Sequence, residues 1–191
     1  PVTIVVVLDA SDDDSTKLAG QYGPDVHFVS IEAGNVGAAR AVGFGYARSL
    51  CGDDTECWYA TTDADSRVDP GWLVHQLGLG ADMVLGVVRV TDWHLRSADL
   101  ADRYVQAYEA DPISDDGQHE HIHGANPGLR ADASATDGGF RALTPGEDVA
   151  LWRALAEQRR IFTREIPVTT SSRLTARAPD GFAGFLRAWA A

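Results

Sequence analysis

Long apolar runs, a basic excess and a set of cysteines are all missing from this 191-residue chain. No apolar stretch approaches the roughly 20 residues that a membrane-spanning helix needs. The first residues also lack the basic start and the small-residue cleavage site of a secretory signal. We therefore expect a cytoplasmic protein with no intrinsic membrane segment.

Basic residues are outnumbered, with 16 Lys and Arg against 28 Asp and Glu and a formal net charge of -12. This charge argues against binding to a nucleic acid, because phosphate backbones are bound by positive surfaces. Any other anionic ligand would also need local positive charge. A metal ion would supply that charge.

Cysteine occurs only twice, as Cys51 and Cys57. The two residues could form a bridge, but two cysteines do not make a disulfide framework, and the cytosol would keep them reduced. We expect free thiols.

What the chain does contain is typical of a globular protein, with 45% hydrophobic and 23% charged residues. Its length is sufficient for one domain with a sizeable core. We find no internal repeat, low-complexity tract or linker, so the sequence predicts a single domain over residues 1–191.

The stretch "VTIVVVL" at residues 2–8 is β-branched and apolar on both of its alternating faces, which is typical of a strand buried on both sides of a parallel sheet. Further strand and helix candidates alternate along the chain, the strands at 26–31, 57–62 and 82–90 and the helices at 15–22, 37–49 and 70–79. Alternation of this kind predicts βαβ units and an α/β fold with a mostly parallel sheet flanked by helices.

The second half of the chain is less regular. A helix is expected near 96–110, followed by the charged loop "DPISDDGQHEHIHG" and by an amphipathic helix that opens at "GEDVALWRALAEQ".

Polar clusters follow the first three expected strands: "DASDDDS", "EAGNVGAAR" and "DADS". Ligands of open α/β sheets bind outside the carboxyl ends of the strands. We therefore expect the three clusters to converge on one crevice.

Asp63 and Asp65 stand one residue apart in the third cluster. In a continuing strand they would point to opposite faces, but at a strand end the backbone can turn and bring both toward a hard cation. Mg²⁺ and Mn²⁺ prefer such oxygen ligands and keep positions open for substrate phosphates. The alternative is that both residues are ordinary loop and helix-capping acids.

Taken in order, the motifs of the chain resemble the family 2 nucleotide-sugar glycosyltransferases of the GT-A fold. The resemblance covers roughly residues 2–160 and rests on five segments: "VVLDASDDDS", "NVGAARAVG", "TTDADSRVDPGWL", "GANPGLRADASATDGGF" and "GEDVALWRAL". Each segment is a weak signal alone, whereas the ordered set is specific.

The resemblance implies a hexosyltransferase-type enzyme that moves a sugar from a nucleotide-diphosphate donor to a hydroxyl of a small-molecule, lipid or glycan acceptor. It implies that Asp9 contacts the base, that Arg40 lies near the base or phosphates, and that Asp63 faces the ribose. Asp65 would hold the divalent cation, Mn²⁺ or Mg²⁺. Asp148 would be the general base of an inverting transfer, taking the proton of the acceptor hydroxyl while the metal stabilises the departing diphosphate.

Plain structural roles compete with three of the functional candidates. The acids Glu147 and Asp148 could merely complement a helix dipole. In "HEHIHG", the alternate histidines could supply a metal ligand, for which His123 is the best candidate because it precedes the family-like "GAN", or they could be solvated loop residues. Arg173 and Arg177 could clamp a diphosphate or an anionic acceptor, or lie on the surface.

The family pattern normally begins with one more strand and helix than this chain shows. We expect their absence to leave an unpaired edge or a gap in the sheet. Two other functions therefore stay open. One is a nucleotidyltransferase of related fold, whose glycine-rich element would lie in the absent part. The other is a nucleotide-sugar-binding module without catalysis.

Overall fold

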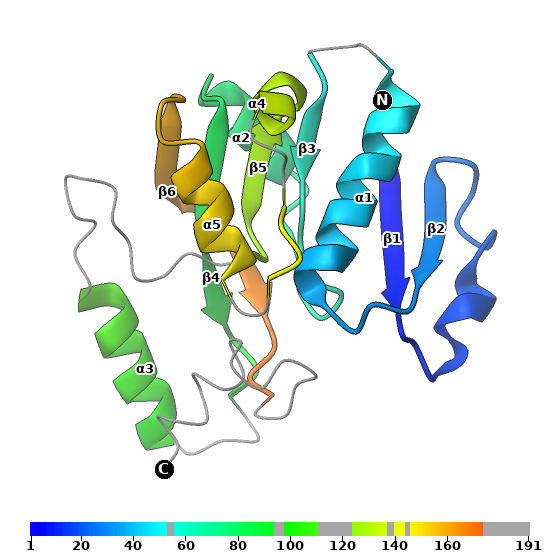
Figure 1. The fold of residues 1–191 in the computed structure, drawn as a ribbon. Helices are drawn as coiled ribbons and strands as arrows, with labels where there is room; N and C mark the ends of the chain where they lie inside the picture. The colour runs from blue at the N-terminus through cyan, green and yellow to red at the C-terminus, as the bar shows by residue number, and fades with distance from the viewer. Residues whose placement is uncertain (53–55, 94–97, 111–123, 137–139, 144–145, 174–191) are drawn as a thin grey trace. The chain divides into compact units, whose positions relative to one another are not determined.

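The computed structural model describes residues 1–52, 56–93, 98–110, 124–136, 140–143 and 146–173 (Figure 1). The chain divides into two compact units. The first unit contains Pro1–Tyr59 and Leu129–Gln158, and the second contains Ala60–Gly128 and Arg159–Ala191. Each unit is described by itself.

A two-stranded parallel sheet begins the first unit. Strand β1 (Ile4–Asp9) pairs with β2 (Val26–Ile31) in a continuous register, from Ile4 opposite Val26 to Asp9 opposite Ile31. Helix α1 (Val36–Cys51) packs on β1. The sequence prediction of β2 is confirmed residue for residue, and α1 begins one residue earlier and ends two residues later than predicted.

Between these strands the expected helix over 15–22 is wrong. The segment forms a 3-10 helix, η1 (Asp14–Leu18), which begins where the Asp13 side chain accepts a hydrogen bond from the Ser15 backbone N–H. Gly20 follows with a φ of 80°, in the left-handed region that a continuing helix does not use. The segment is therefore too short for a full α-helix.

Strand β1 is also less buried than its sequence predicts. Ile4 is 52% exposed and the other five residues are half-buried, whereas β4 (Met83–Val90) is buried at every position except Arg89. Within the described residues, β1 pairs with one strand only, in a sheet of two. This single partner explains why an all-apolar strand keeps part of its surface exposed.

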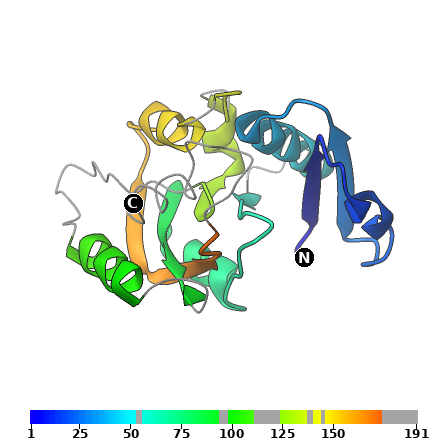
Figure 2. The ribbon, with the colours of Figure 1, turned by 90° about the horizontal axis from the view of Figure 1, so that it is seen from below.

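The second sheet has the strand order β3-β5-β4-β6. Strand β3 (Trp58–Ala60) and strand β5 (Pro127–Arg130) each begin in one unit and end in the other. Strands β4 and β6 (Arg160–Thr170) lie side by side and parallel (Figure 2), with a break in register between Gly86 and Val88.

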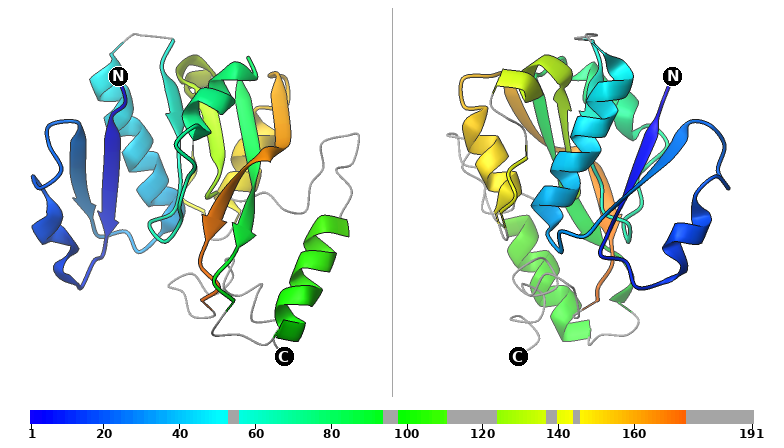
Figure 3. Two further views of the ribbon diagram at one scale, coloured as in Figure 1. Left: turned by 180° about the vertical axis from the view of Figure 1, so that it is seen from behind. Right: turned by 45° about the vertical axis from the view of Figure 1, so that its right-hand side comes forward.

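Four short helices complete the described chain (Figure 3). They are α2 (Trp72–Gly78), which contacts β6, α3 (Ala98–Ala110), α4 (Ala131–Thr136) and α5 (Glu147–Ala154). Among the described helices we find none with the length and apolar composition of a membrane-spanning segment.

The core of the second unit is built around β4. Tyr104 of α3 is buried against a cluster of β4 valines, and its ring lies 5.4 Å from the ring of Trp93. Helix α3 therefore contributes Tyr104 to this core.

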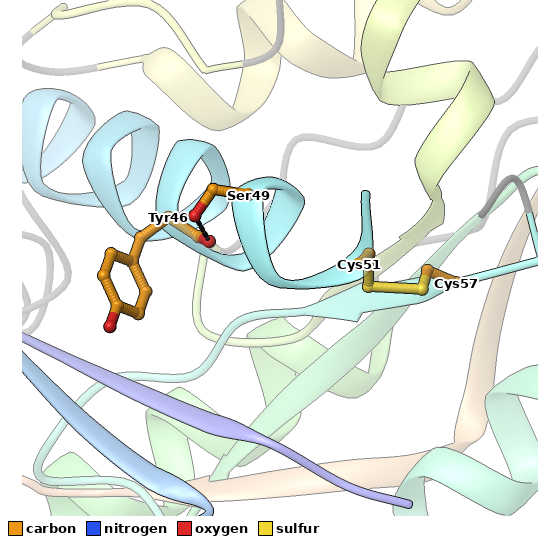
Figure 4. The surroundings of a disulfide bond; sticks show 4 residues. All are labelled: Tyr46, Ser49, Cys51 and Cys57. Atoms are coloured by element: carbon orange, nitrogen blue, oxygen red, sulfur yellow. Dashed lines mark hydrogen bonds between the residues drawn. A yellow bond between two sulfur atoms is a disulfide. The ribbon is translucent and has the colours of Figure 1, made fainter. Parts of the chain in front are cut away.

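A disulfide joins Cys51, the last residue of α1, to Cys57, just before β3 (Figure 4). The expectation of free thiols is wrong. Their Cα atoms lie 6.7 Å apart, within bridging range. Disulfides persist mainly in oxidising compartments and are rare in the cytosol. The expected cytoplasmic location is not tested by the structure and stays a prediction.

Candidate functional site

Asp9 ends β1 and ties it to the loop before α1. Its Oδ1 accepts hydrogen bonds of 2.8 Å from the backbone N–H groups of Ala33 and Gly34, and its Oδ2 accepts one of 2.7 Å from Asn35 N–H. Asn35 in turn caps α1, because its Oδ1 accepts a 2.9 Å hydrogen bond from Ala38 N–H. Two of the three polar clusters therefore meet, and the convergence of all three on one crevice stays a prediction.

This arrangement gives Asp9 a clear structural task. Three amides converge on one carboxylate, which fixes the start of α1 relative to β1. Contact between Asp9 and a nucleotide base stays a prediction.

Arg40 lies in α1 and forms an ion pair with Glu147, the first residue of α5. Its Nη1 donates to Glu147 Oε1, and the two side chains are only 10% and 6% exposed. The guanidinium also stands 5.9 Å from the ring centroid of Phe140, a cation–π contact. A buried pair of this kind neutralises both charges and places α5 against α1.

Phe140, the aromatic residue of the "GGF" segment, is itself part of the first unit's core. Its ring meets Phe44 edge to face at 5.0 Å, and Phe44 meets Tyr59 in the same way at 5.6 Å. The adjoining chain also approaches α1 at Gly37, where a Cβ would collide with the Arg141 carbonyl oxygen. Gly37 is therefore required for this close approach.

Asp148 stands in the first turn of α5, as the sequence predicts. It is half-buried, and its Oδ1 accepts a 2.8 Å hydrogen bond from Val149 N–H. The preceding Gly146, with a φ of 97°, is the N-cap and provides no side-chain cap. The positive end of the helix dipole lies at this position. Leu151, Trp152 and Leu155 are buried, which confirms the apolar face expected for this helix.

The Asp-x-Asp element lies in the second unit, after β3. The backbone turns between Asp63 and Ser66, with a 3.0 Å hydrogen bond from Ser66 N–H to the Asp63 carbonyl. A turn at this strand end agrees with the sequence prediction, whereas the approach of both carboxylates to a cation stays a prediction. The Oδ2 atom of Asp65 lies 2.9 Å from Nε of Arg173, just beyond β6.

Two residues of the "GANPGLRADASATDGGF" segment have structural roles. Asn126 is fully buried: its amide donates to the carbonyls of Val87 (2.9 Å) and Ile166 (2.8 Å) and accepts from Trp72 Nε1 (2.7 Å). At the start of α4, Arg130 donates two hydrogen bonds to Asp132, which hold the pKa of that carboxyl below its usual value. Both contacts are structural.

The predicted metal ligands were tested against this geometry. Asp65 is a partly exposed oxygen ligand, 27% accessible, of the type that Mg²⁺ and Mn²⁺ prefer. Within the described ranges no group of three or more His, Cys, Asp or Glu side chains could hold a metal ion. The role of Asp65 as a metal ligand stays a prediction. His123, the second proposed ligand, lies outside the described residues.

Three residues make long-range polar contacts that no local pattern encodes: Glu147, Asn126 and Arg173. Glu147 and Arg173 stood out in the sequence, as a helix-start acid and as a cation in an acidic chain, but their partners did not. Asn126 carried no functional signal of its own.

Comparison with known proteins identifies the family. Residues 1–136 match the sequence model of Glycosyl transferase family 2. The chain belongs to this family. No curated protein sequence matches it significantly.

Solved structures of TarS from S. aureus share the fold. The 1–349 fragment in complex with UDP-GlcNAc superposes with a TM-score of 0.66 at 13% identity, over 94% of this chain and 52% of that one. The same fragment in a second structure gives 0.61 at 13% identity, over 89% and 51%. Another TarS structure gives 0.62 at 13% identity, over 88% and 31%. These matches confirm the GT-A-like α/β fold, and the chain spans about half the length of the TarS fragments.

Proposed function

We propose that this chain is a glycosyltransferase that moves a sugar from a nucleotide-diphosphate donor to an acceptor hydroxyl. The observation that carries the proposal is the match to family 2 over residues 1–136. The Asp63–Ser66 turn after β3 and the position of Asp148 at the start of α5 support it. Asp148 lies beyond the matched range, so its role rests on its motif and its place in the fold.

In the proposed reaction the acceptor oxygen bonds to the anomeric carbon as the bond from that carbon to the diphosphate oxygen breaks. Asp148 takes the proton of the acceptor hydroxyl, and the nucleoside diphosphate leaves with the electron pair. A single displacement of this kind inverts the anomeric centre. Arg40 pairs with Glu147, which leaves Asp148 as the proposed base at the positive end of the helix dipole.

A divalent cation fits this proposal at Asp65, where Mn²⁺ or Mg²⁺ would neutralise charge on the departing diphosphate. Asp63 is proposed to face the donor ribose and Asp9 its base. One TarS structure contains UDP-GlcNAc, so UDP-GlcNAc is the first donor to test. Small-molecule, lipid and glycan hydroxyls all remain proposed acceptors.

A thermal-shift panel of nucleoside diphosphates, with and without Mn²⁺, tests donor binding. A ligand present at 100 times its Kd and bound only to the native state stabilises it by about 2.7 kcal/mol, which raises Tm by about 5–11 °C in a chain of this size. We expect such a shift with Mn²⁺ for one base. No shift with any nucleotide would contradict the proposal.

Turnover tests the base. Asp148→Asn should leave donor affinity within about threefold, a change of under ~0.7 kcal/mol, and should lower turnover by roughly 10² or more. Asp25→Asn, the same change at an exposed site in the first unit, is the matched control. Donor binding without any transfer would indicate a binding module, and release of pyrophosphate from a nucleoside triphosphate would indicate a nucleotidyltransferase.

A further inference from the structure

The end of β6 is fastened to the turn that carries Asp63 and Asp65. Arg67 and Thr169 exchange two backbone hydrogen bonds, of 2.7 and 3.0 Å. The next pair of residues in this antiparallel contact is also joined, because Ser66 Oγ donates to Thr170 Oγ1 at 3.0 Å. The Asp-x-Asp turn is therefore fixed to one particular strand end.

The chain directly after β6 is held just as firmly. Ser172 donates from its backbone N–H to Asp92 Oδ1 (2.8 Å) and from its hydroxyl to the Asp92 carbonyl (3.0 Å). Arg173 N–H donates to Ser171 Oγ at 3.2 Å. These contacts set the backbone from which the Arg173 side chain reaches Asp65.

The ion pair between Arg173 and Asp65 is monodentate, with one atom of each side chain in contact. Nε contacts Oδ2 at 2.9 Å, while both Nη groups of Arg173 and Oδ1 of Asp65 have no partner among the described residues. The side chains are 57% and 27% exposed. An ion pair this exposed contributes little to stability, so folding does not account for it.

This geometry leaves the parts of both side chains that bind ligands available. The planar Nη edge of an arginine matches the oxygens of a phosphate, and one oxygen of Asp65 remains for a cation. A guanidinium this close to the carboxylate also repels a second cation.

We propose that Arg173 and a divalent cation share Asp65, and that the Nη edge of Arg173 binds the diphosphate of the donor. The proposal rests on the proposed function. Arg173 occupies Asp65 in the free protein and weakens its affinity for a lone cation. A diphosphate brings negative charge that draws the guanidinium and relieves the repulsion, so cation and diphosphate bind together.

Binding of Mn²⁺ alone, followed by the electron paramagnetic resonance signal of free Mn²⁺, tests the first half. Arg173→Ala should tighten Mn²⁺ binding to the free protein at least about fivefold, as expected for removing a neighbouring positive charge. Asp65→Asn should abolish that gain. Arg103→Ala is the matched control, because Arg103 also pairs through Nε with one aspartate oxygen, Asp99 Oδ2 at 3.0 Å, in the same unit.

Inorganic pyrophosphate tests the second half by calorimetry without metal. Its affinity should fall about tenfold in Arg173→Ala and less in Arg173→Lys, which keeps the charge and loses the planar fork. Equal Mn²⁺ affinities in Arg173→Ala and the unchanged protein would overturn the proposal, as would equal losses of pyrophosphate affinity in Arg103→Ala. Neither measurement uses a nucleotide, so a nucleotide panel without a hit would defeat the proposed function separately.

Discussion

Removing one member of the Arg40–Glu147 pair should destabilise the protein strongly. With side chains 10% and 6% exposed, the survivor would be a buried charge without its partner, which typically costs about 3–5 kcal/mol. Arg40→Met removes the cation. Glu147→Met removes the anion, and its cost should be about 0.5–1 kcal/mol smaller because the Phe140 ring still faces the remaining guanidinium.

The double variant separates this reasoning from a simple loss of packing. With both charges gone, two apolar side chains fill the space, and replacing a buried pair in this way is often close to neutral. The double variant should therefore be roughly 2 kcal/mol or more stabler than either single variant, and the cycle should give a coupling of several kcal/mol. Urea unfolding followed by circular dichroism measures all four proteins, with midpoint shifts of about 1–2 M for the single variants. Single costs below about 1 kcal/mol that simply add would refute the buried pair.

Three further perturbations follow from the described contacts. Reduction of the Cys51–Cys57 bond with dithiothreitol should lower the free energy of unfolding by about 2 kcal/mol, which is the closure entropy of so short a loop. In the same unfolding assay, dithiothreitol should have no effect on a Cys51→Ser/Cys57→Ser variant. Asn126→Ala should lower the free energy of unfolding by roughly 3 kcal/mol or more, because it leaves Trp72 Nε1 and two carbonyls unpaired in the core. Asn35→Ala should lower it by only about 1 kcal/mol, as the loss of a helix cap. Unfolding followed by Trp fluorescence measures the stabilities of both variants. In calorimetry, Asp65→Ala should abolish Mn²⁺-dependent nucleotide binding, and Asp63→Ala should only weaken it. Asp102→Asn, at an exposed position, is the control. Equal nucleotide affinity with and without excess chelator would contradict the metal role.

Local patterns predicted those elements whose boundaries are also local. Strand β2 is flanked by Gly23 and Gly34, both with positive φ, and its predicted bounds are confirmed. Helix α1 begins at an Asn cap and ends before Gly52, which also has positive φ. In both cases short-range signals near the element mark its ends.

Strand β6 shows where local reasoning fails. Ile166, Val168 and Thr170 are buried at alternate positions, which is the period of a strand, yet Pro167 and three charged residues between 160 and 165 obscure the pattern. The strand passes Pro167 at a break in its register with β4. Only the partner strand makes that proline tolerable, and a single sequence does not reveal the partner.

In the candidate site, too, the sequence predicted the features that depend on neighbouring residues and did not predict the long-range contacts. The order of motifs placed Asp148 at a helix start and the Asp63–Asp65 element in a turn, because both positions depend on neighbouring residues. The partners Glu147 and Arg173 depend on chain segments about a hundred residues from the residues they bind, and no periodicity connects them. Their identification required the fold.

Glu147 and Asp148 are adjacent acids whose surroundings assign them different tasks. Successive residues of a helix point about 100° apart, so when Glu147 faces Arg40 in the interior, Asp148 must face elsewhere. Glu147 is neutralised and buried, and its replacement should act mainly on stability. Asp148 is half-buried at the positive end of the helix, with one oxygen on Val149 N–H. Two carboxylates set apart by environment are a recurring basis of acid–base chemistry, and the ion pair of the first fixes the helix that presents the second.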